Sequence, residues 1–135
     1  MLEIKLILCD SAQIYDGKLS MLGAGWWWIR PGIPYSVAAL VEVPWDKTNT
    51  KLKGVFDLVD EDGQALSPDG TNPLRLEVEF EVGRPAGMKS GSSQRVPLFV
   101  SVFPMDVKYA KPGRYSWRLE VEHQSSSVSF DFVVQ

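Results

Sequence analysis

Apolar and polar residues alternate with a period of two along most of the chain, and convincing helical periodicity is absent. Three stretches carry the alternation most clearly, namely residues 74–82, 114–122 and 128–134. In each stretch, large apolar side chains occupy every second position and charged residues or serines separate them. This pattern is typical of antiparallel sheets with one face on a core and the other in water.

Further strands are predicted at about 2–8, 18–29, 36–44, 52–60 and 95–103, which gives about eight strands in all. Turn dipeptides separate them: Pro31-Gly32, Asp62-Gly63, Asp69-Gly70 and Pro112-Gly113. Residues 10–17 predict one helical turn or an irregular connection. Short strands at this spacing favour an all-β, antiparallel two-layer β-sandwich. We expect a single domain over residues 1–135.

Composition narrows the possible functions. The net charge of -3 and the pI of about 5.1 argue against a nucleic-acid partner, because phosphate neutralisation needs a basic surface. No apolar stretch is long enough to cross a bilayer, so we expect no membrane partner. The first ten residues, MLEIKLILCD, alternate like a strand and do not resemble a signal peptide. A single cysteine favours a reducing compartment, so the expected location is the cytoplasm, or a virion if a phage encodes the chain.

Three longer stretches carry a family resemblance: DSAQIYDGKLSMLGAGW (10–26), FEVGRPAGMKSGSSQRVPLFV (80–100) and KPGRYSWRLEVE (111–122). Together they resemble a family of small, uncharacterised all-β proteins found mainly in actinobacteria, and possibly also in their phages. The resemblance implies a fold and supplies no catalytic residues. This chain departs from the family pattern in its triple tryptophan and its serine-rich loop.

The stretch KPGRYSW also resembles the entry to a late strand of immunoglobulin-like and fibronectin-like sandwiches. In those folds a Pro-Gly turn precedes a tyrosine whose ring packs inward and whose hydroxyl ties down a loop. The resemblance implies that Tyr115 takes this position here. The Cys…Trp…Cys spacing of true immunoglobulin domains is missing.

The tryptophans Trp26, Trp27 and Trp28 depart from the alternating pattern. In a strand, Trp26 and Trp28 would point to one side and Trp27 to the other, so one core layer cannot take all three. One interpretation is a central strand whose outer side is covered by a loop or a terminus. The alternatives are an exposed aromatic surface for a protein partner or a platform for a sugar ring. Pro34, Tyr35 and Trp45 would extend such a surface if the next strand pairs alongside.

Residues 83–94, GRPAGMKSGSSQ, predict a mobile loop. One interpretation is a solvated connection between two strands. The other is an arm that orders on a partner, with Arg84 and Lys89 as contact residues. In that case we expect Arg84 to pair with carboxylates of a neighbour, such as those of the acidic strand face 77–81.

No set of residues predicts catalysis, a cofactor or a metal site. His123 is the only histidine and lies at an expected strand end, where no catalytic triad can be argued. Cys9 would need that histidine as its base, and zinc would need more ligands than these two. The run Asp60-Glu61-Asp62 lacks the spacing of a calcium loop and reads as a solvated hairpin turn. We therefore expect that the chain is not an enzyme.

The leading hypothesis is a non-enzymatic protein-interaction or assembly module that binds a protein partner or itself. Self-association is its simplest version, because an exposed apolar patch or edge strand pairs readily with its own copy. A carbohydrate or small-ligand binding module with exposed Trp and Tyr faces is the first alternative. A phage virion surface or decoration protein is the second, by analogy of fold.

Overall fold

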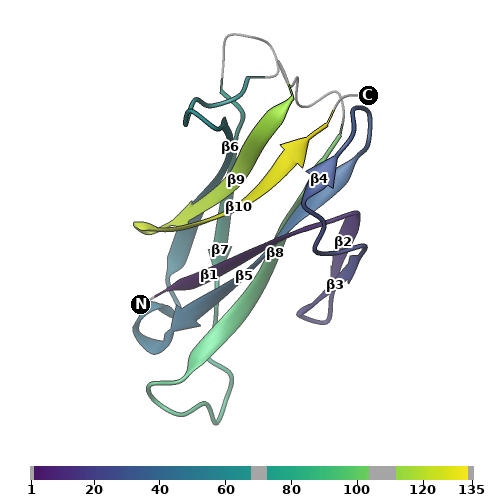
Figure 1. Ribbon diagram of the computed structural model, residues 1–135. Helices are drawn as coiled ribbons and strands as arrows, with labels where there is room; N and C mark the ends of the chain where they lie inside the picture. The colour runs from purple at the N-terminus through teal and green to yellow at the C-terminus, as the bar shows by residue number, and fades with distance from the viewer. Residues whose placement is uncertain (1, 68–72, 104–111, 134–135) are drawn as a thin grey trace.

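The computed structural model describes residues 2–67, 73–103 and 112–133, and within these it contains ten strands and one short 3-10 helix (Figure 1). The strands are β1 (Glu3–Cys9), β2 (Ser11–Tyr15), β3 (Lys18–Leu22), β4 (Trp28–Ile29), β5 (Tyr35–Pro44), β6 (Lys51–Asp60), β7 (Arg75–Glu81), β8 (Ser93–Val102), β9 (Gly113–Val121) and β10 (Gln124–Phe132). The helix is η1 (Trp45–Lys47). The described residues contain no helix long and apolar enough to span a bilayer.

The strands form two packed sheets and a separate hairpin. A three-stranded sheet has the order β1-β5-β8, and a five-stranded sheet has the order β4-β10-β9-β6-β7. All pairs are antiparallel except β4, which runs parallel to β10 at the edge of the larger sheet. The all-β two-layer sandwich expected from the alternation is confirmed.

The core lies between the inward faces of the two sheets. Alternate residues of β5 are fully buried and face β6, β9 and β10, which contribute the large side chains Phe56, Trp117 and Phe130. The indole Nε1 of Trp117 donates to the hydroxyl of Tyr35 at 2.8 Å and so links the two sheets. A buried polar tip that finds its partner avoids the cost of an unpaired donor. The ring of Tyr115 packs inward against Phe130, and the likeness of this stretch to immunoglobulin-like sandwiches stays a prediction.

Two segments differ from the expected strands. Residues 10–17 form no helical turn but contain β2, and residues 18–29 form two short strands, β3 and β4, in place of one long strand. The first difference arises at Asp16 and Gly17, whose positive φ angles make a tight turn between β2 and β3. The second arises at Gly23 and Gly25, whose positive φ angles are incompatible with a continuous strand.

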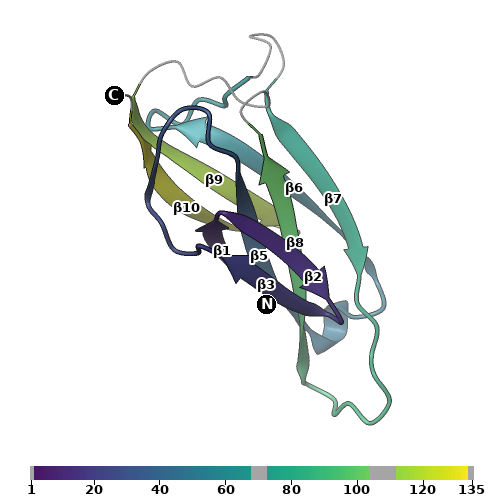
Figure 2. The ribbon, with the colours of Figure 1, turned by 90° about the vertical axis from the view of Figure 1, so that its right-hand side faces the viewer.

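Residues 10–34, which we call the excursion, leave the three-stranded sheet between β1 and β5. These strands pair directly, with Cys9 opposite Ser36, so a turn of a few residues would suffice to join them. The chain instead builds the β2–β3 hairpin, a loop and β4 before it returns. The hairpin lies over the outer face of β5 and β8 (Figure 2). This cover explains why Cys9, Ser36 and Ala38 are buried although they lie on the outer side of the sheet.

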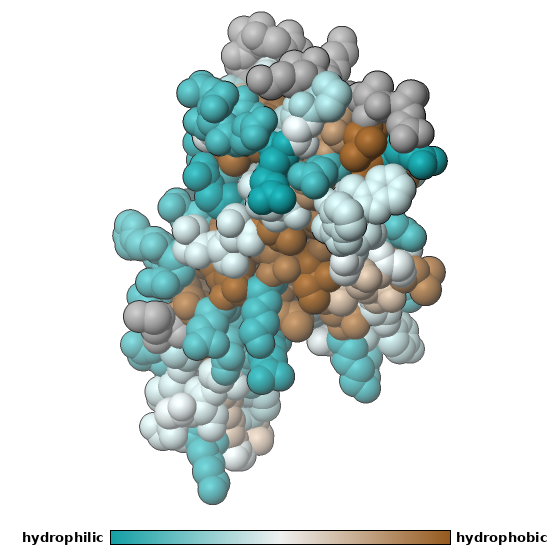
Figure 3. Space-filling model, viewed as in Figure 1, coloured by the Kyte–Doolittle hydropathy of each residue, from teal (hydrophilic) through white to brown (hydrophobic). Residues whose placement is uncertain are grey.

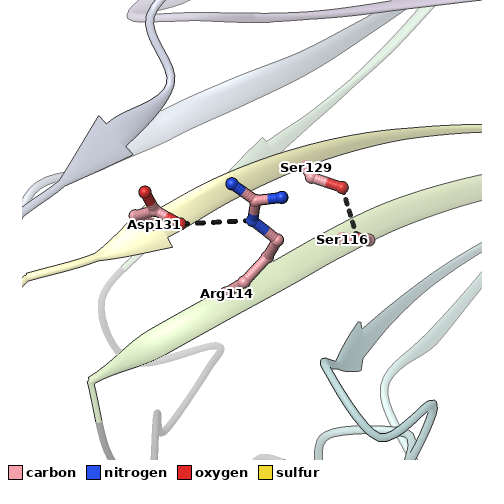
Figure 4. Close-up of polar contacts among 4 residues, drawn as sticks. All are labelled: Arg114, Ser116, Ser129 and Asp131. Carbon is pink, nitrogen blue, oxygen red and sulfur yellow. Dashed lines mark hydrogen bonds and ion pairs between the residues drawn. The ribbon is translucent and has the colours of Figure 1, made fainter.

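The outer face of the five-stranded sheet is polar and internally paired. Arg118 donates from two nitrogens to the two carboxylate oxygens of Asp57, at 3.0 and 2.7 Å. Arg114 of β9 bonds Asp131 of β10, and the hydroxyls of Ser116 and Ser129 meet at 2.7 Å (Figure 4). These contacts pair several, though not all, of the polar side chains of this face with partners on neighbouring strands.

Candidate functional site

The exposed large apolar side chains gather on the excursion. Seven such residues occur among the described residues, and six of them belong to the excursion: Ile14, Tyr15, Leu22, Trp27, Trp28 and Ile33. In Figure 3, apolar atoms form a band between β10 and β1 and reach the right-hand side, where the excursion lies. We call these six side chains the excursion surface.

The tryptophan segment joins the edges of the two sheets. The amide of Gly25 donates to the carbonyl oxygen of Leu8 in β1, at 2.8 Å. Two residues later, the carbonyl oxygen of Trp27 accepts from the amide of Asp131 in β10, also at 2.8 Å. The segment therefore closes one side of the sandwich, and its backbone position is fixed by hydrogen bonds to both sheets.

The three tryptophans have different environments. Trp26 is half-buried and packs edge-to-face against Tyr35 and Phe130, with ring centroids 5.3 and 6.0 Å apart. Its Nε1 is buried and has no hydrogen-bond partner within the described residues. Trp27 and Trp28 are 65% and 42% exposed. One tryptophan thus anchors the segment in the core, and the next two reach the surface.

This arrangement corrects the interpretation of the segment as a covered central strand. β4 has only two residues and lies at a sheet edge, because the glycines at 23 and 25 prevent a longer strand. Of the residues in the alternative interpretation, an exposed aromatic surface, Trp27 and Trp28 are exposed and Tyr35 is not. Tyr35 is buried and bonded to Trp117, so it belongs to the core.

Trp45 and Arg84 also lie away from Trp27 and Trp28. Trp45 follows the far end of β5 and is half-buried in η1, a whole strand away from the segment 26–28. The guanidinium of Arg84 stacks over its ring at 4.1 Å and donates to its carbonyl oxygen at 3.0 Å. Arg84 also donates to the hydroxyl of Thr48, which in turn donates to the same carbonyl. Arg84 therefore fastens the start of the 82–92 loop to η1.

Lys89 is exposed in the same loop. It forms no ion pair within residues 2–67, 73–103 and 112–133. The structure thus separates Lys89 from the tryptophan segment, and its role as a contact residue stays a prediction.

A groove of about 610 Å³ opens beside the tryptophan segment. Its lining consists of Asp10, residues 23–30 and Ile33, so the excursion builds all of it. Arg30 lies over the ring of Trp28 at 5.3 Å, and the carboxylate of Asp10 lies against Gly23. Aromatic walls with one acid and one base suit an apolar or aromatic side chain of a partner.

Cys9, His123 and the acidic run at residues 60–62 lie apart in the part of the chain that the structure describes. Cys9 is fully buried, and this burial, with a smaller contribution from Asp10, raises the pKa of its thiol and lowers its nucleophilicity. His123 is exposed in the turn between β9 and β10, on the opposite side of the molecule from the end of β1 (Figure 1). Asp60 accepts the backbone amides of Asp62 and Gln64 at 2.9 Å and so shapes its own turn.

Comparison with known protein families gives one match, which covers residues 5–134 and is a family of unknown function, DUF6941. The chain belongs to this family. No curated protein matches the chain. Membership of DUF6941 agrees with the expected lack of an assigned activity in the family and identifies no site residue.

Several residues of the site were missed in the sequence. Asp10, Leu22, Arg30 and Ile33 were not singled out, because nothing in the local pattern brings them together. Tyr15 was placed in an irregular connection, although the following Asp16-Gly17 pair is a hairpin signal that would have identified its position at the tip. The groove depends on the close approach of residues 10 and 23, which a one-dimensional pattern does not encode.

Proposed function

We propose that the chain is a protein-interaction module that binds a protein partner through the excursion surface. The observation that carries the proposal is the placement of six of the seven exposed large apolar side chains of the described residues on one segment. Single exposed apolar residues are common on soluble proteins, whereas larger apolar patches are typical of interaction sites. Trp27, Trp28 and Ile33 line one groove, and Tyr15 and Leu22 share the outward face of the β2–β3 hairpin.

The position of the excursion in the fold supports the same function. Residues 10–34 are not needed to join β1 to β5, because these strands are already neighbours. Binding residues are disproportionately found on connecting segments that a rigid scaffold holds in position. Hydrogen bonds from Gly25, Trp27 and Ile29 to both sheets hold the exposed rings in place, and a pre-organised surface loses less entropy on binding.

The chemistry of the groove favours a protein over a carbohydrate. A sugar platform needs an open ring face and several polar side chains for the hydroxyl groups. Here Arg30 covers one face of Trp28, and Asp10 and Arg30 are the only charged side chains among the lining residues. Aromatic and apolar contacts with few polar groups are typical of the centre of a protein interface.

Photo-crosslinking in cells of the source organism tests the proposal. A photoreactive residue at position 22, on the exposed side of β3, should yield a protein adduct of discrete mass. The same residue at position 127, on the polar outer face of β10, serves as the matched control and should yield none. The adduct at position 22 should disappear with Trp27→Ser.

The proposal is wrong if position 22 gives no protein adduct. It is also wrong if the adduct forms equally at position 127. A shift of tryptophan fluorescence on titration with oligosaccharides, in the absence of any adduct, would replace it with the carbohydrate-binding function.

A further inference from the structure

We infer that the excursion surface binds a second copy of this chain, with Tyr15 at the tip of the β2–β3 hairpin of each copy seated in the groove of the other. This inference rests on the proposed function and names the partner and the contact. It is carried by an exposed aromatic tip, an aromatic groove and unpaired charges that match, all within residues 10–34.

The tip has the properties of an inserted group. Tyr15 is 77% exposed, the highest value among the exposed large apolar residues. It lies directly opposite Lys18 in the hairpin, whereas the half-buried residues of the hairpin, Ala12, Leu19 and Met21, occupy the alternate positions that face the three-stranded sheet. A tyrosine offers a large rigid ring with a polar end, which is why it is enriched at interface centres.

The groove has the properties of a receiving site. Its aromatic lining includes Trp27 and Trp28, and its volume of about 610 Å³ exceeds what one aromatic side chain fills. Ile33, which is 52% exposed, lies at the same opening. Seating a tyrosine ring there removes apolar surface of both copies from water, which favours association.

The charges around the tip and the groove are complementary. Asp16 and Lys18 flank Tyr15, and Asp10 and Arg30 belong to the groove lining. None of the four forms an ion pair within the described part of the chain. When a tip enters a groove, Asp16 can face Arg30 and Lys18 can face Asp10, so each charge meets one of opposite sign.

A two-fold axis satisfies both copies at once. The hairpin and the tryptophan segment lie on the same side of the molecule, at the right in Figure 1. Each copy then contributes one tip and one groove, and the two contacts close without leaving a further site exposed. A standard interface buries about 800 Å² per partner, and the exposed side chains that can contribute to it are Tyr15, Leu22, Trp27, Trp28 and Ile33.

Complementation between two variants tests the contact. Tyr15→Ser removes both tips of a dimer and keeps its grooves, whereas Trp27→Ser impairs both grooves and keeps its tips. In sedimentation equilibrium, the wild-type mass should rise from 15.1 kDa towards twice that value with concentration. Each variant alone should dimerise at least about tenfold more weakly, as expected of central interface residues. An equimolar mixture should dimerise more strongly than either variant, because the mixed dimer regains one tip–groove contact.

A charge exchange gives an independent readout. Asp16→Arg should weaken dimerisation by placing like charges together, and addition of Arg30→Asp to the same chain should restore it. Both positions are exposed, so the fold should be retained in these variants. Failure of the second substitution to restore dimerisation would contradict the arrangement of tip and groove.

The outcomes separate this inference from the proposed function. A wild-type chain that stays monomeric at millimolar concentration overturns the inference, and a crosslinked adduct at position 22 with another protein would then leave the proposed function standing. A wild-type dimer whose two variants fail to complement each other overturns the seating of the tip. A monomer that also gives no adduct overturns both.

Discussion

The outer face of the five-stranded sheet and the excursion surface are both exposed, yet they are built in opposite ways. On the sheet, arginines and serines of β9 bond partners on the neighbouring strands, as Arg118 does with Asp57. On the excursion, large apolar side chains are exposed, and Asp10, Asp16, Lys18 and Arg30 form no ion pair within the described residues. The first surface is polar and carries ion pairs between neighbouring strands, whereas the second exposes large apolar side chains that we propose a partner covers.

The edge strands show the same contrast. β8 contains Pro97, which lacks a backbone amide, and β7 alternates the charged residues Arg75, Glu77, Glu79 and Glu81 along its length. Proline and charge are two devices by which edge strands avoid pairing with other chains. β4 has neither device, and its first residue is the exposed Trp28. Protection of β7 and β8 would direct association away from these two edges.

The largest expected effect is on stability, and it should differ between a tryptophan in the core and a tryptophan on the surface. Trp117→Ala should lower the free energy of unfolding by about 3–5 kcal/mol, because it leaves a cavity and removes the partner of Tyr35. Trp27→Ser should change it by less than about 0.5 kcal/mol, since a surface position makes few contacts. Urea denaturation of the two variants measures both values. An equal loss of unfolding free energy in both variants would show that Trp27 is a core residue, which would contradict the contrast between the two surfaces.

A second prediction concerns Trp26, which is half-buried and packs against the core residues Tyr35 and Phe130. Trp26→Ala should cost about 2–3 kcal/mol, less than the loss at Trp117 because the ring is only half-buried. Trp26→Phe should be close to neutral, because it keeps an aromatic ring against Tyr35 and removes a buried donor without a partner in the described residues. Thermal unfolding of the wild type and both variants ranks their stabilities. If Phe proves as harmful as Ala, the indole nitrogen has a partner that stabilises the fold.

Arg84→Ala should act on stability and not on association. It removes the contact with the ring of Trp45 and the hydrogen bonds to the η1 region, which together contribute about 1–2 kcal/mol. Lys89→Ala serves as the control from the same loop, and it should have no measurable effect on stability. Sedimentation of both variants should match the wild type. If Arg84→Ala weakens association and leaves stability unchanged, Arg84 contacts the partner, as expected from the sequence.

The smallest effect is expected on the polar face. Arg114→Ala, alone or with Asp131→Ala, should lower stability by less than about 1 kcal/mol, because both side chains of this ion pair are partly exposed. Neither variant should affect association, since both residues lie on the outer face of the five-stranded sheet and not on the excursion. Chemical denaturation checks the first statement, and the solution mass checks the second. If either variant dissociates the dimer, the interface lies on the five-stranded sheet and not on the excursion.

The regular strands were predictable because one face of each sheet is buried, and this requires an apolar residue at every second position of a strand. β7 and β9 were placed within a residue or so by that pattern, and so was the inward ring of Tyr115. The excursion was predicted poorly. Its strands have two to five residues, too few for a period to emerge, and β4 is defined by hydrogen bonds to strands more than 100 positions away.

The candidate site was predictable only in part, for the same reason. Trp27 and Trp28 stood out by residue type, and the alternation excluded a common core layer for the triplet. The burial of Tyr35 could not be predicted, because it depends on Trp117 across the sandwich. The role of Arg84 depends on Trp45 and Thr48, which are brought beside it by the β6–β7 hairpin rather than by local sequence.

Hydrogen exchange at two protein concentrations tests the central claim most directly, because it compares both surfaces in one experiment. Mass spectrometry of peptides from dilute and concentrated wild-type chain reports where backbone amides become protected on association. We predict slower exchange in residues 10–34 at the higher concentration and unchanged exchange in residues 113–132. Protection of residues 113–132 with none in residues 10–34 would contradict the account.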